Sequence, residues 1–401
     1  MLTRLLRILL WLASGSTVAV FALVIMRHIG RPIAVDPIET AVLEYARRIA
    51  EQRLLYGEPL VPSPSPMMPG FPAVVSLLLP PFGSELWVPR AVSLGAMIVT
   101  AGLVCAIIRV ETLSWTLASA GVGLVLAGCG LIVGQPETAR PEWLMLMFVV
   151  AGFTTLRFSK GSWGALLSAL MLSAACFTHV SALWFVAAMI FYVVIEGYRP
   201  LMVLLPALAV LLAAGQILMS WGLGQWFNFY AWDLPFSSLR FAPAQLLYFM
   251  GNQMLGKLGV LVVAALISLA LPTPPWRGVR GVWMCMGVSA LMAGLLSSQN
   301  PGAGTELLLP GVIALTLLGA ISIHSVTIQL ATRPGATRGD GRGIVLAALA
   351  LQFLVFFATL PSDRMSLRAL ASEPAPAMLP PVVDPAMSAT ATAGPADISR
   401  P

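Results

Sequence analysis

Long apolar runs dominate this 401-residue chain and restrict what it can fold into. A run of about 20 predominantly apolar residues is long enough to cross the hydrocarbon core of a bilayer as a helix, and a helix satisfies its own backbone polar groups there. The sequence therefore predicts an all-α, multi-pass membrane protein with eleven spans. These spans are residues 5–27, 86–108, 113–134, 142–156, 162–178, 180–196, 200–221, 254–272, 281–297, 306–323 and 343–361.

Composition agrees with this class. Only 10% of the residues are charged and 58% are hydrophobic, whereas soluble chains carry about 25% charged residues. The unbroken apolar stretch from Ile8 to Met26 exceeds the ~7–15 residues of a signal-peptide core, so we expect a retained first helix. All four cysteines fall within apolar runs, which indicates neither a disulfide framework nor a metal site.

The basic residues of the short loops predict a cytoplasmic N-terminus. With that orientation, the outer side holds all but three of the 17 acidic residues; the exceptions are Glu111, Glu196 and Asp340. The net charge of +6 comes largely from arginines scattered over inner loops, which favours contact with anionic lipid headgroups over nucleic acid. Most basic residues are Arg and few are Lys, and Ala, Gly and Pro are abundant. This bias is typical of high-GC bacterial proteins, so we expect a bacterial inner-membrane protein with its active face toward the periplasm.

Residues 28–85 form a long first outer segment. Asp36-Pro37 can start a helix as N-cap and first helical residue, and the following apolar period predicts an amphipathic interfacial helix that stops at Gly57. A short apolar piece, 71–79, is expected to lie along the membrane. We interpret residues 1–361 as one transmembrane domain and 362–401 as a disordered, Ala/Pro-rich periplasmic tail.

Outer residues 221–253 form a loop rich in aromatic side chains. The pattern is typical of an aromatic belt at the lipid headgroups, and a wall that binds sugar or lipid is the alternative.

The acidic pair Asp36 and Glu39 is the first candidate for chemistry. Three residues apart at a helix start, the two carboxylates are expected to share a face, where the helix N-terminus favours their ionised forms. The alternative is purely structural, with Asp36 as N-cap and Glu39 as its capping-box partner. Ionisable groups at membrane depth are candidates for function, and the other outer ones include Arg90, Glu137, Arg140, Glu142, His179, Lys257 and Glu306.

The segment VDPIETAVLEYARRIAEQRLLYGEPL, followed by MMPGFPAVVSLLLPPFGSELWVPRAVSLGA, resembles the start of GT-C-type glycosyltransferases that use polyprenyl-phosphate sugars. This superfamily includes protein O-mannosyltransferases and lipid A aminoarabinose transferases. The matching positions are Asp36, Glu39, Tyr56, the PGFP stretch at 69–72 and Arg90. TARPEWLMLM (138–147) is similar to the family's A-R-P-D segment, and NPGAGTELLLP (300–310), which begins at Asn300, to its late G-A-x-x-N-Y segment.

The resemblance covers roughly the first 190 residues and then falls to isolated matches. The chain departs from the family pattern at three places. Glu142 stands where Asp is usual, Glu306 stands near the usual Asn, and Thr178-His179 replaces a Lys often found after the fifth span. These departures leave two alternatives open, a different donor or a loss of activity.

The resemblance implies transfer of a sugar from a polyprenyl-phosphate donor to an acceptor hydroxyl on a glycan, lipid or protein. Asp36 is predicted to be the general base, and Glu39 to hold the acceptor or raise the pKa of Asp36. Arg140 is the predicted phosphate partner, because a guanidinium can bind phosphate through two hydrogen bonds. The scheme requires no cofactor and leaves a divalent metal open. The other predicted substrate-binding residues are Tyr56, Arg90, Glu137, Glu142, His179, Lys257, Asn300 and Glu306.

Two other classes of function remain open. A transporter or flippase of lipid-linked sugars would place ionisable groups near mid-membrane, where this chain has almost none. An envelope assembly subunit without an active site would use Asp36 and Glu39 only as a helix cap. Movement of a labelled sugar from polyprenyl phosphate to an acceptor distinguishes an enzyme from both.

Overall fold

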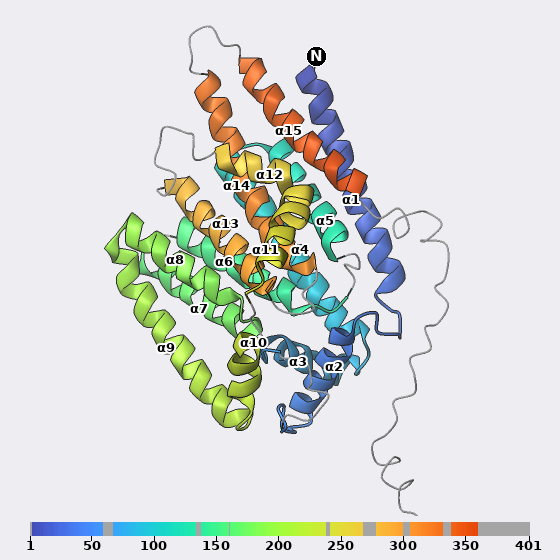
Figure 1. Ribbon diagram of the computed structural model, residues 1–401, viewed down its shortest axis with the longest axis vertical. Coiled ribbons are helices and arrows are strands. Elements are labelled where there is room, and N and C mark those ends of the chain that lie inside the picture. Colours follow the sequence, from blue (N-terminus) through green and yellow to red (C-terminus); the bar gives the residue numbers. More distant parts are fainter. Residues whose placement is uncertain are drawn as a thin grey trace, which may run out of the picture. The chain divides into compact units, whose positions relative to one another are not determined.

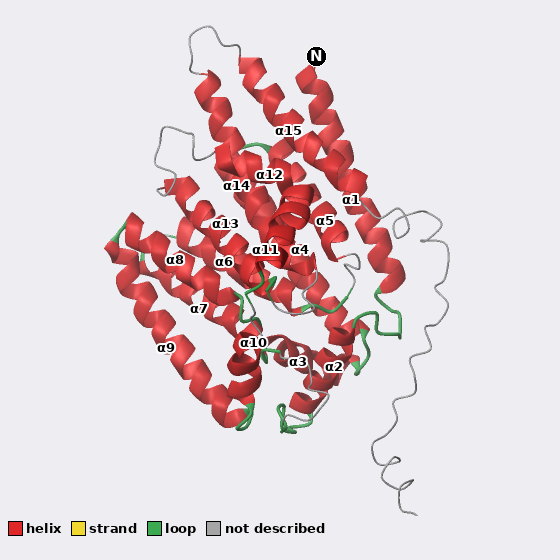
Figure 2. Ribbon diagram, in the orientation of Figure 1, coloured by secondary structure: helices red, strands yellow, loops and turns green. Residues whose placement is uncertain are grey.

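The computed structural model describes residues 2–58, 67–133, 138–159, 161–237, 241–267, 278–299, 305–331 and 338–359, and these ranges contain helices and loops but no strand (Figure 2). Within the described residues, each predicted span overlaps a helix, and the all-α prediction is confirmed. The helices are α1 Leu2–His28, α4 Trp87–Thr112, α5 Trp115–Val133, α6 Pro141–Phe158, α7 Ser162–Thr178, α8 Ala182–Glu196, α9 Tyr198–Gly222, α12 Gly256–Leu266, α13 Gly278–Ser297, α14 Leu309–Ala331 and α15 Arg338–Thr359. The predicted tail, 362–401, lies outside the described residues.

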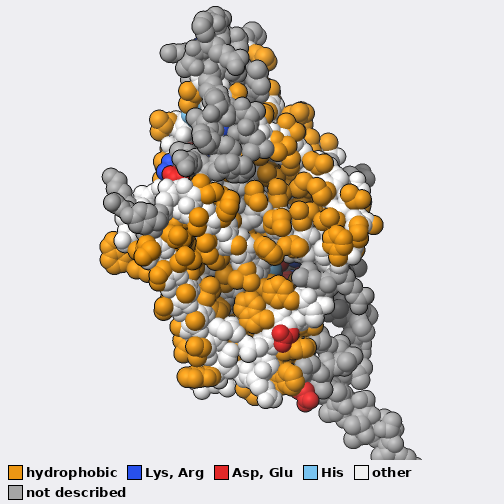
Figure 3. Space-filling view, turned by 60° about the vertical axis from the view of Figure 1, so that its left-hand side comes forward, with side chains coloured by type: hydrophobic (Ala, Val, Ile, Leu, Met, Phe, Trp, Pro, Cys, Tyr) orange, Lys and Arg blue, Asp and Glu red, His pale blue; other side chains and the backbone are white. Residues whose placement is uncertain are grey.

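Several helices are suited to a bilayer. By length and composition, six helical segments of the described chain are long and apolar enough to cross one: Leu2–His28, Trp87–Thr112, Pro200–Gly222, Pro243–Leu266, Arg280–Ser297 and Leu309–Ile328. Hydrophobic side chains are spread over the described part of the face in Figure 3, and on α9 Val210 and Leu218 are 64% and 65% exposed. Apolar exposure on this scale marks a lipid-facing surface. The protein is therefore a multi-pass membrane protein, and eleven crossings stay a prediction.

The described part of residues 28–85, the predicted first outer segment, contains two helices, α2 (Pro37–Ala50) and α3 (Gly70–Phe82), which pack against each other at one end of the helical array (Figure 1). Asp36 is the N-cap of α2: its backbone is extended and its Oδ1 accepts a hydrogen bond from the Ile38 N–H at 2.9 Å. α2 buries one face, which includes Val42 and Ala46. The predicted amphipathic helix and its start are confirmed.

The predicted end of this helix at Gly57 is wrong, because α2 already ends at Ala50. Gln52 adopts a left-handed conformation (φ 55°) and the Arg53 N–H bonds to the Arg48 carbonyl, the closing pattern of a Schellman-type helix end. The chain then turns so that Leu54 is 68% exposed while Tyr56 is buried.

The aromatic outer loop is largely helical. After α9 the chain forms the π-helix η1 (Phe229–Asp233), α10 (Leu234–Ser237), α11 (Pro243–Tyr248) and a second π-helix, η2 (Phe249–Leu255), which leads into α12. Phe227 and Tyr230 are buried, and the Tyr230 ring stacks on Tyr56 with centroids 5.4 Å apart. These two side chains therefore pack against the first outer segment, and neither lies in an exposed aromatic belt.

Close backbone packing holds α3 in place. The start of α3 lies against the end of α7, and a Cβ at Gly70 would be 2.5 Å from the Phe177 carbonyl oxygen. Only glycine permits this approach, which gives a physical reason for the glycine of the PGFP stretch. α6 packs against both α4 and α7, so the helix that begins beside Arg140 has neighbours on two sides.

Candidate active site

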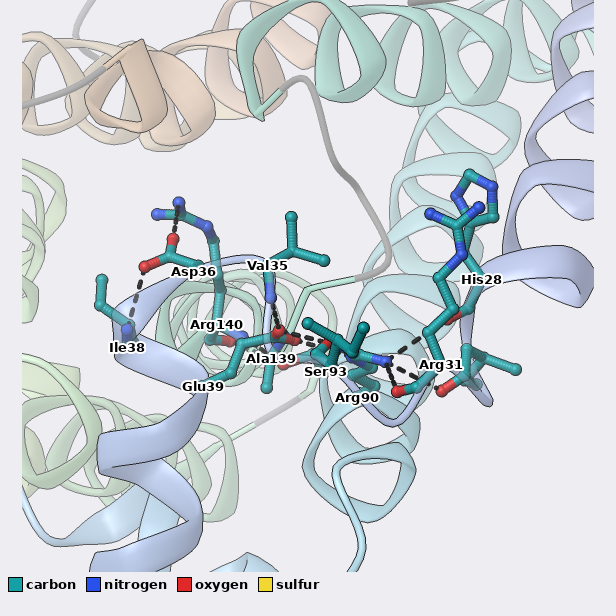
Figure 4. Close-up of polar contacts among 12 residues, drawn as sticks. His28, Arg31, Val35, Asp36, Ile38, Glu39, Arg90, Ser93, Ala139 and Arg140 are labelled. Carbon is teal, nitrogen blue, oxygen red and sulfur yellow. Dashed lines mark hydrogen bonds and ion pairs between the residues drawn. The ribbon is translucent and has the colours of Figure 1, made fainter. Parts of the chain in front are cut away.

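Two predicted site residues, Asp36 and Arg140, form an ion pair across 104 residues of sequence. Arg140 Nη2 lies 2.5 Å from Asp36 Oδ2, and the side chains of Arg140 and Asp36 are 12% and 17% exposed, respectively. Both stand directly before a helix, since Asp36 precedes α2 and Arg140 precedes α6. Figure 4 shows the carboxylate and the guanidinium on the same side of α2. The structure therefore places a base candidate beside an anion-binding candidate.

The Arg140 backbone is fixed by one serine. Arg140 N–H donates to Ser93 Oγ at 2.7 Å, and that hydroxyl donates to the Arg140 carbonyl at 2.9 Å. Ser93 belongs to α4, so the loop before α6 is attached to α4 at this point.

The Arg140 guanidinium has two nitrogen donors that no described hydrogen bond uses. Its Nε and Nη1 are buried, and neither has a hydrogen-bond partner among the described residues. The same holds for Glu142 Oε2, in the first turn of α6. A buried polar group without a partner costs about 1–3 kcal/mol, and more when it is charged, so such groups call for an explanation such as a ligand.

Glu39 and Arg90 form a second, fully buried ion pair. Arg90 Nε and Nη2 donate to the two carboxylate oxygens of Glu39 at 2.8 and 2.9 Å, and the side chains of Arg90 and Glu39 are 1% and 0% exposed. Glu39 also accepts hydrogen bonds from the N–H groups of Val35 and Ala139, each at 2.9 Å. Arg90 further donates to backbone carbonyls of the α1–α2 connection: His28, Ile29, Arg31 and Ile33.

These contacts set the protonation of Glu39. Burial raises the pKa of its carboxyl, but hydrogen bonds from Arg90, Val35 and Ala139 outweigh burial, so the pKa lies below its usual value. Glu39 is thus an ionised carboxylate. The prediction that Asp36 and Glu39 act together on one face does not match these contacts, because each carboxylate binds a different arginine (Figure 4).

The other predicted residues are dispersed. Tyr56 donates its hydroxyl to the Met67 carbonyl at 2.6 Å and lies in the aromatic cluster with Tyr230. His179 follows α7, and its Nδ1 lies 2.8 Å from Ser181 Oγ. Lys257 is half-buried in the first turn of α12. No described contact joins any of these three predicted residues to Asp36 or Arg140.

Three predicted residues lie wholly or partly outside the described part. Glu137 and Asn300 fall outside the described residues, and Glu306 lies in the short helix η4 (Thr305–Leu308) with no described side chain. Among the described residues no group of three or more His, Cys, Asp or Glu is arranged to hold a metal ion.

Sequence reasoning missed the residues that hold the site together. Ser93 and the Ala139 N–H make decisive contacts, yet a serine in an apolar helix and a backbone amide carry no recognisable pattern. The only available signal for Ser93 was its spacing, one helical turn after Arg90 on α4.

No protein-family model matches this chain, and no curated protein sequence matches it either. Two solved structures are similar in fold. ArnT from Cupriavidus metallidurans bound to undecaprenyl phosphate has a TM-score of 0.58 at 12% identity, and the match covers 89% of this chain and 77% of that one. The apo state of the same enzyme has a TM-score of 0.56 at 13% identity with the same coverage. ArnT is an aminoarabinose transferase of the GT-C type, so this chain has a GT-C-type fold, as the sequence resemblance implied.

Proposed function

We propose that this protein is an integral membrane glycosyltransferase that takes a sugar from a polyprenyl-phosphate donor and transfers it to an acceptor hydroxyl. The Asp36–Arg140 pair carries the proposal, because a carboxylate touches an arginine that has two buried donors without a described partner. A base next to an unfilled anion site is the combination that this transfer needs.

The reaction assigns each group a step. The acceptor oxygen forms a bond to the anomeric carbon while the bond from that carbon to the phosphate oxygen breaks. Asp36 takes the proton of the acceptor hydroxyl. The polyprenyl phosphate departs with the bonding electron pair, and Arg140 stabilises its negative charge through Nε and Nη1.

The position of Arg140 at the start of α6 adds to its attraction for phosphate. The first N–H groups of a helix have no intrahelical partner and favour an anion. Pro141 at the first helical position removes one of these donors, so the guanidinium is the larger contributor. Glu142 would then face the sugar, since its Oε2, which has no partner among the described residues, is an acceptor for hydroxyl groups. His179 and Lys257 are further substrate-binding candidates.

The solved ArnT complex supports the donor class, since that enzyme was crystallised with undecaprenyl phosphate. We propose a polyprenyl phosphate of this kind as the carrier here, presented at the periplasmic face of a bacterial inner membrane. The acceptor is a glycan, lipid or protein hydroxyl.

The test uses purified protein in proteoliposomes with radiolabelled sugars on undecaprenyl phosphate and a membrane extract as acceptor. We expect label to leave the donor lipid, and the lipid and glycan profile of a deletion strain to lose one sugar by mass spectrometry. Movement of intact donor between leaflets without transfer would establish a flippase instead. An unchanged profile together with no transfer would contradict the proposal.

A further inference from the structure

The Glu39–Arg90 pair connects four parts of the chain that are separate in sequence. Arg90 lies on α4 and binds carbonyls of the α1–α2 connection, including those of Arg31 (2.7 Å) and Ile33 (2.9 Å). Glu39 lies on α2 and accepts the Ala139 N–H from the loop before α6. One buried ion pair therefore fixes the α1–α2 connection, α2, α4 and that loop relative to one another.

The pair has no capacity left for a substrate. Each carboxylate oxygen of Glu39 accepts two hydrogen bonds, and each of the three guanidinium nitrogens of Arg90 donates to a protein atom. Both side chains are also shielded from solvent. A role in direct proton transfer or acceptor binding would require one of these contacts to break.

The contacts of Glu39 sit next to the two reactive groups. The Val35 N–H that donates to Glu39 belongs to the residue before Asp36, and the Ala139 N–H to the residue before Arg140. Ser93, one turn from Arg90 on α4, holds the backbone of Arg140 itself. The carboxylate of Glu39 thus determines the separation of two backbone segments, and each segment carries one member of the Asp36–Arg140 pair.

We propose that Glu39 and Arg90 are positioning residues, which hold Asp36 and Arg140 at the separation that the transfer requires. This inference rests on the proposed function. It replaces the sequence-based expectation that Glu39 holds the acceptor or raises the pKa of Asp36.

The chain provides a matched control pair at the far ends of α4 and α6. Glu111, near the end of α4, accepts a hydrogen bond from Arg157 Nε, near the end of α6, at 3.0 Å. This pair joins α4 to α6 directly, and the side chain of Glu111 is 6% exposed. No described contact joins Glu111 or Arg157 to Asp36 or Arg140, so Glu111→Gln perturbs helix packing away from the site.

The experiment compares Glu39→Gln with Glu111→Gln. In Glu39→Gln the new side-chain amide brings a donor among groups that are all donors, so the Val35 or Ala139 N–H loses its acceptor. A misplacement of about 1 Å can cost ~10²-fold in rate, and we expect kcat/KM for the lipid donor to fall by that order in Glu39→Gln, with a raised KM. Glu111→Gln should lower only the yield of folded protein, and the KM of the protein that does fold should be unchanged.

Hydrogen exchange followed by mass spectrometry gives a readout that needs no activity. Glu39→Gln should raise amide exchange in peptides that contain Val35 and Ala139, and Glu111→Gln should not. Wild-type kinetics in Glu39→Gln, or a loss of rate that only follows the loss of folded protein, would overturn the positioning role.

Failure of the proposed function would look different. If wild-type protein transfers no sugar from any polyprenyl-phosphate donor, that proposal fails. The hydrogen-exchange data then test only whether Glu39 holds the backbone at Val35 and Ala139. Unchanged exchange at these two residues in Glu39→Gln would refute that claim.

Discussion

The two arginine–carboxylate pairs at the start of α2 differ in how completely their donors are used. Arg90 gives every nitrogen to protein acceptors and is 1% exposed, whereas Arg140 gives one nitrogen to Asp36 and leaves Nε and Nη1 buried without a described partner. The described hydrogen bonds complete the first pair, whereas the second pair has two donors left for the anion that we propose. The two pairs are both shielded from solvent to a large degree, so their unequal use of hydrogen-bond donors, more than their burial, is the basis for proposing a positioning role for one and a binding role for the other.

The largest effect is expected for Asp36→Asn, which distinguishes a general base from a residue that only caps α2. Asn caps a helix about as well as Asp, so Asp36→Asn should remain folded, yet its amide cannot take the proton of the acceptor. Turnover should fall ~10²–10⁴-fold, the usual share of general base catalysis. Arg140 would lose its anion, so binding of undecaprenyl phosphate should hold or tighten.

Activity and donor binding are measured on the same preparation, with melting temperature as the control for folding. Full turnover in well-folded Asp36→Asn protein would remove Asp36 from catalysis.

The next effect is on stability, and it applies to the saturated pair. Arg90→Met leaves the Glu39 carboxylate buried without a cation, and removing one partner of a buried pair costs about 3–5 kcal/mol. We expect a sharp drop in melting temperature and yield. Arg140→Met, whose partner Asp36 is partly exposed and also caps α2, should remain much closer to wild type. Equal losses in both variants would refute the contrast between the two pairs.

Arg140→Lys tests the unsaturated pair more gently. Lysine keeps the charge but loses the planar fork that serves Asp36 and a phosphate at once. A hydrogen bond to a charged group contributes about 1.5–3 kcal/mol, so KM for the lipid donor should rise about 10–100-fold while some turnover remains. Unchanged donor affinity in folded protein would mean that Arg140 only holds its loop.

The smallest effect is a dependence of stability on pH. Since the folded protein lowers the pKa of Glu39 from its usual value of 4.5, the folded state binds this proton more weakly than the unfolded chain does. The stabilisation is complete above about pH 4.5 and is lost as pH falls through the folded-state pKa. Melting temperatures should therefore be nearly level from pH 7 to about pH 5 and decline below. Glu39→Gln should lower the whole curve and reduce its slope on the acid side.

The sequence predicted the helical class and the start of α2, because hydropathy and cap chemistry are local signals. It also selected Asp36 and Arg140 as candidates, and the structure places them side by side. It did not predict which charges pair. The i, i+3 rule placed Asp36 and Glu39 on one face, but Asp36 is an extended N-cap (φ −126°, ψ 134°) and lies outside the helical repeat. The partners of these acids are 51 and 104 residues away, which no local period reports.

Longer-range packing was equally invisible in the sequence. A polar residue within an apolar span, Gln352, is fully buried and donates to the Lys257 carbonyl while accepting the Leu261 N–H. The apolar run around Gln352 predicted only a span. Its hydrogen-bond partners lie on another helix, α12, and could be recognised only once α12 and α15 were seen to pack together.

The close contact between Gly70 and Phe177 has a consequence for biosynthesis. The chain reaches Phe177 about 100 residues after Gly70, and ribosomes add about 5–20 residues per second. For roughly 5–20 s, α3 has been synthesised but its docking surface at the end of α7 has not. During that interval the nascent protein holds an apolar helix whose packing partner has not yet been made, and α3 can dock only after α7 has been synthesised.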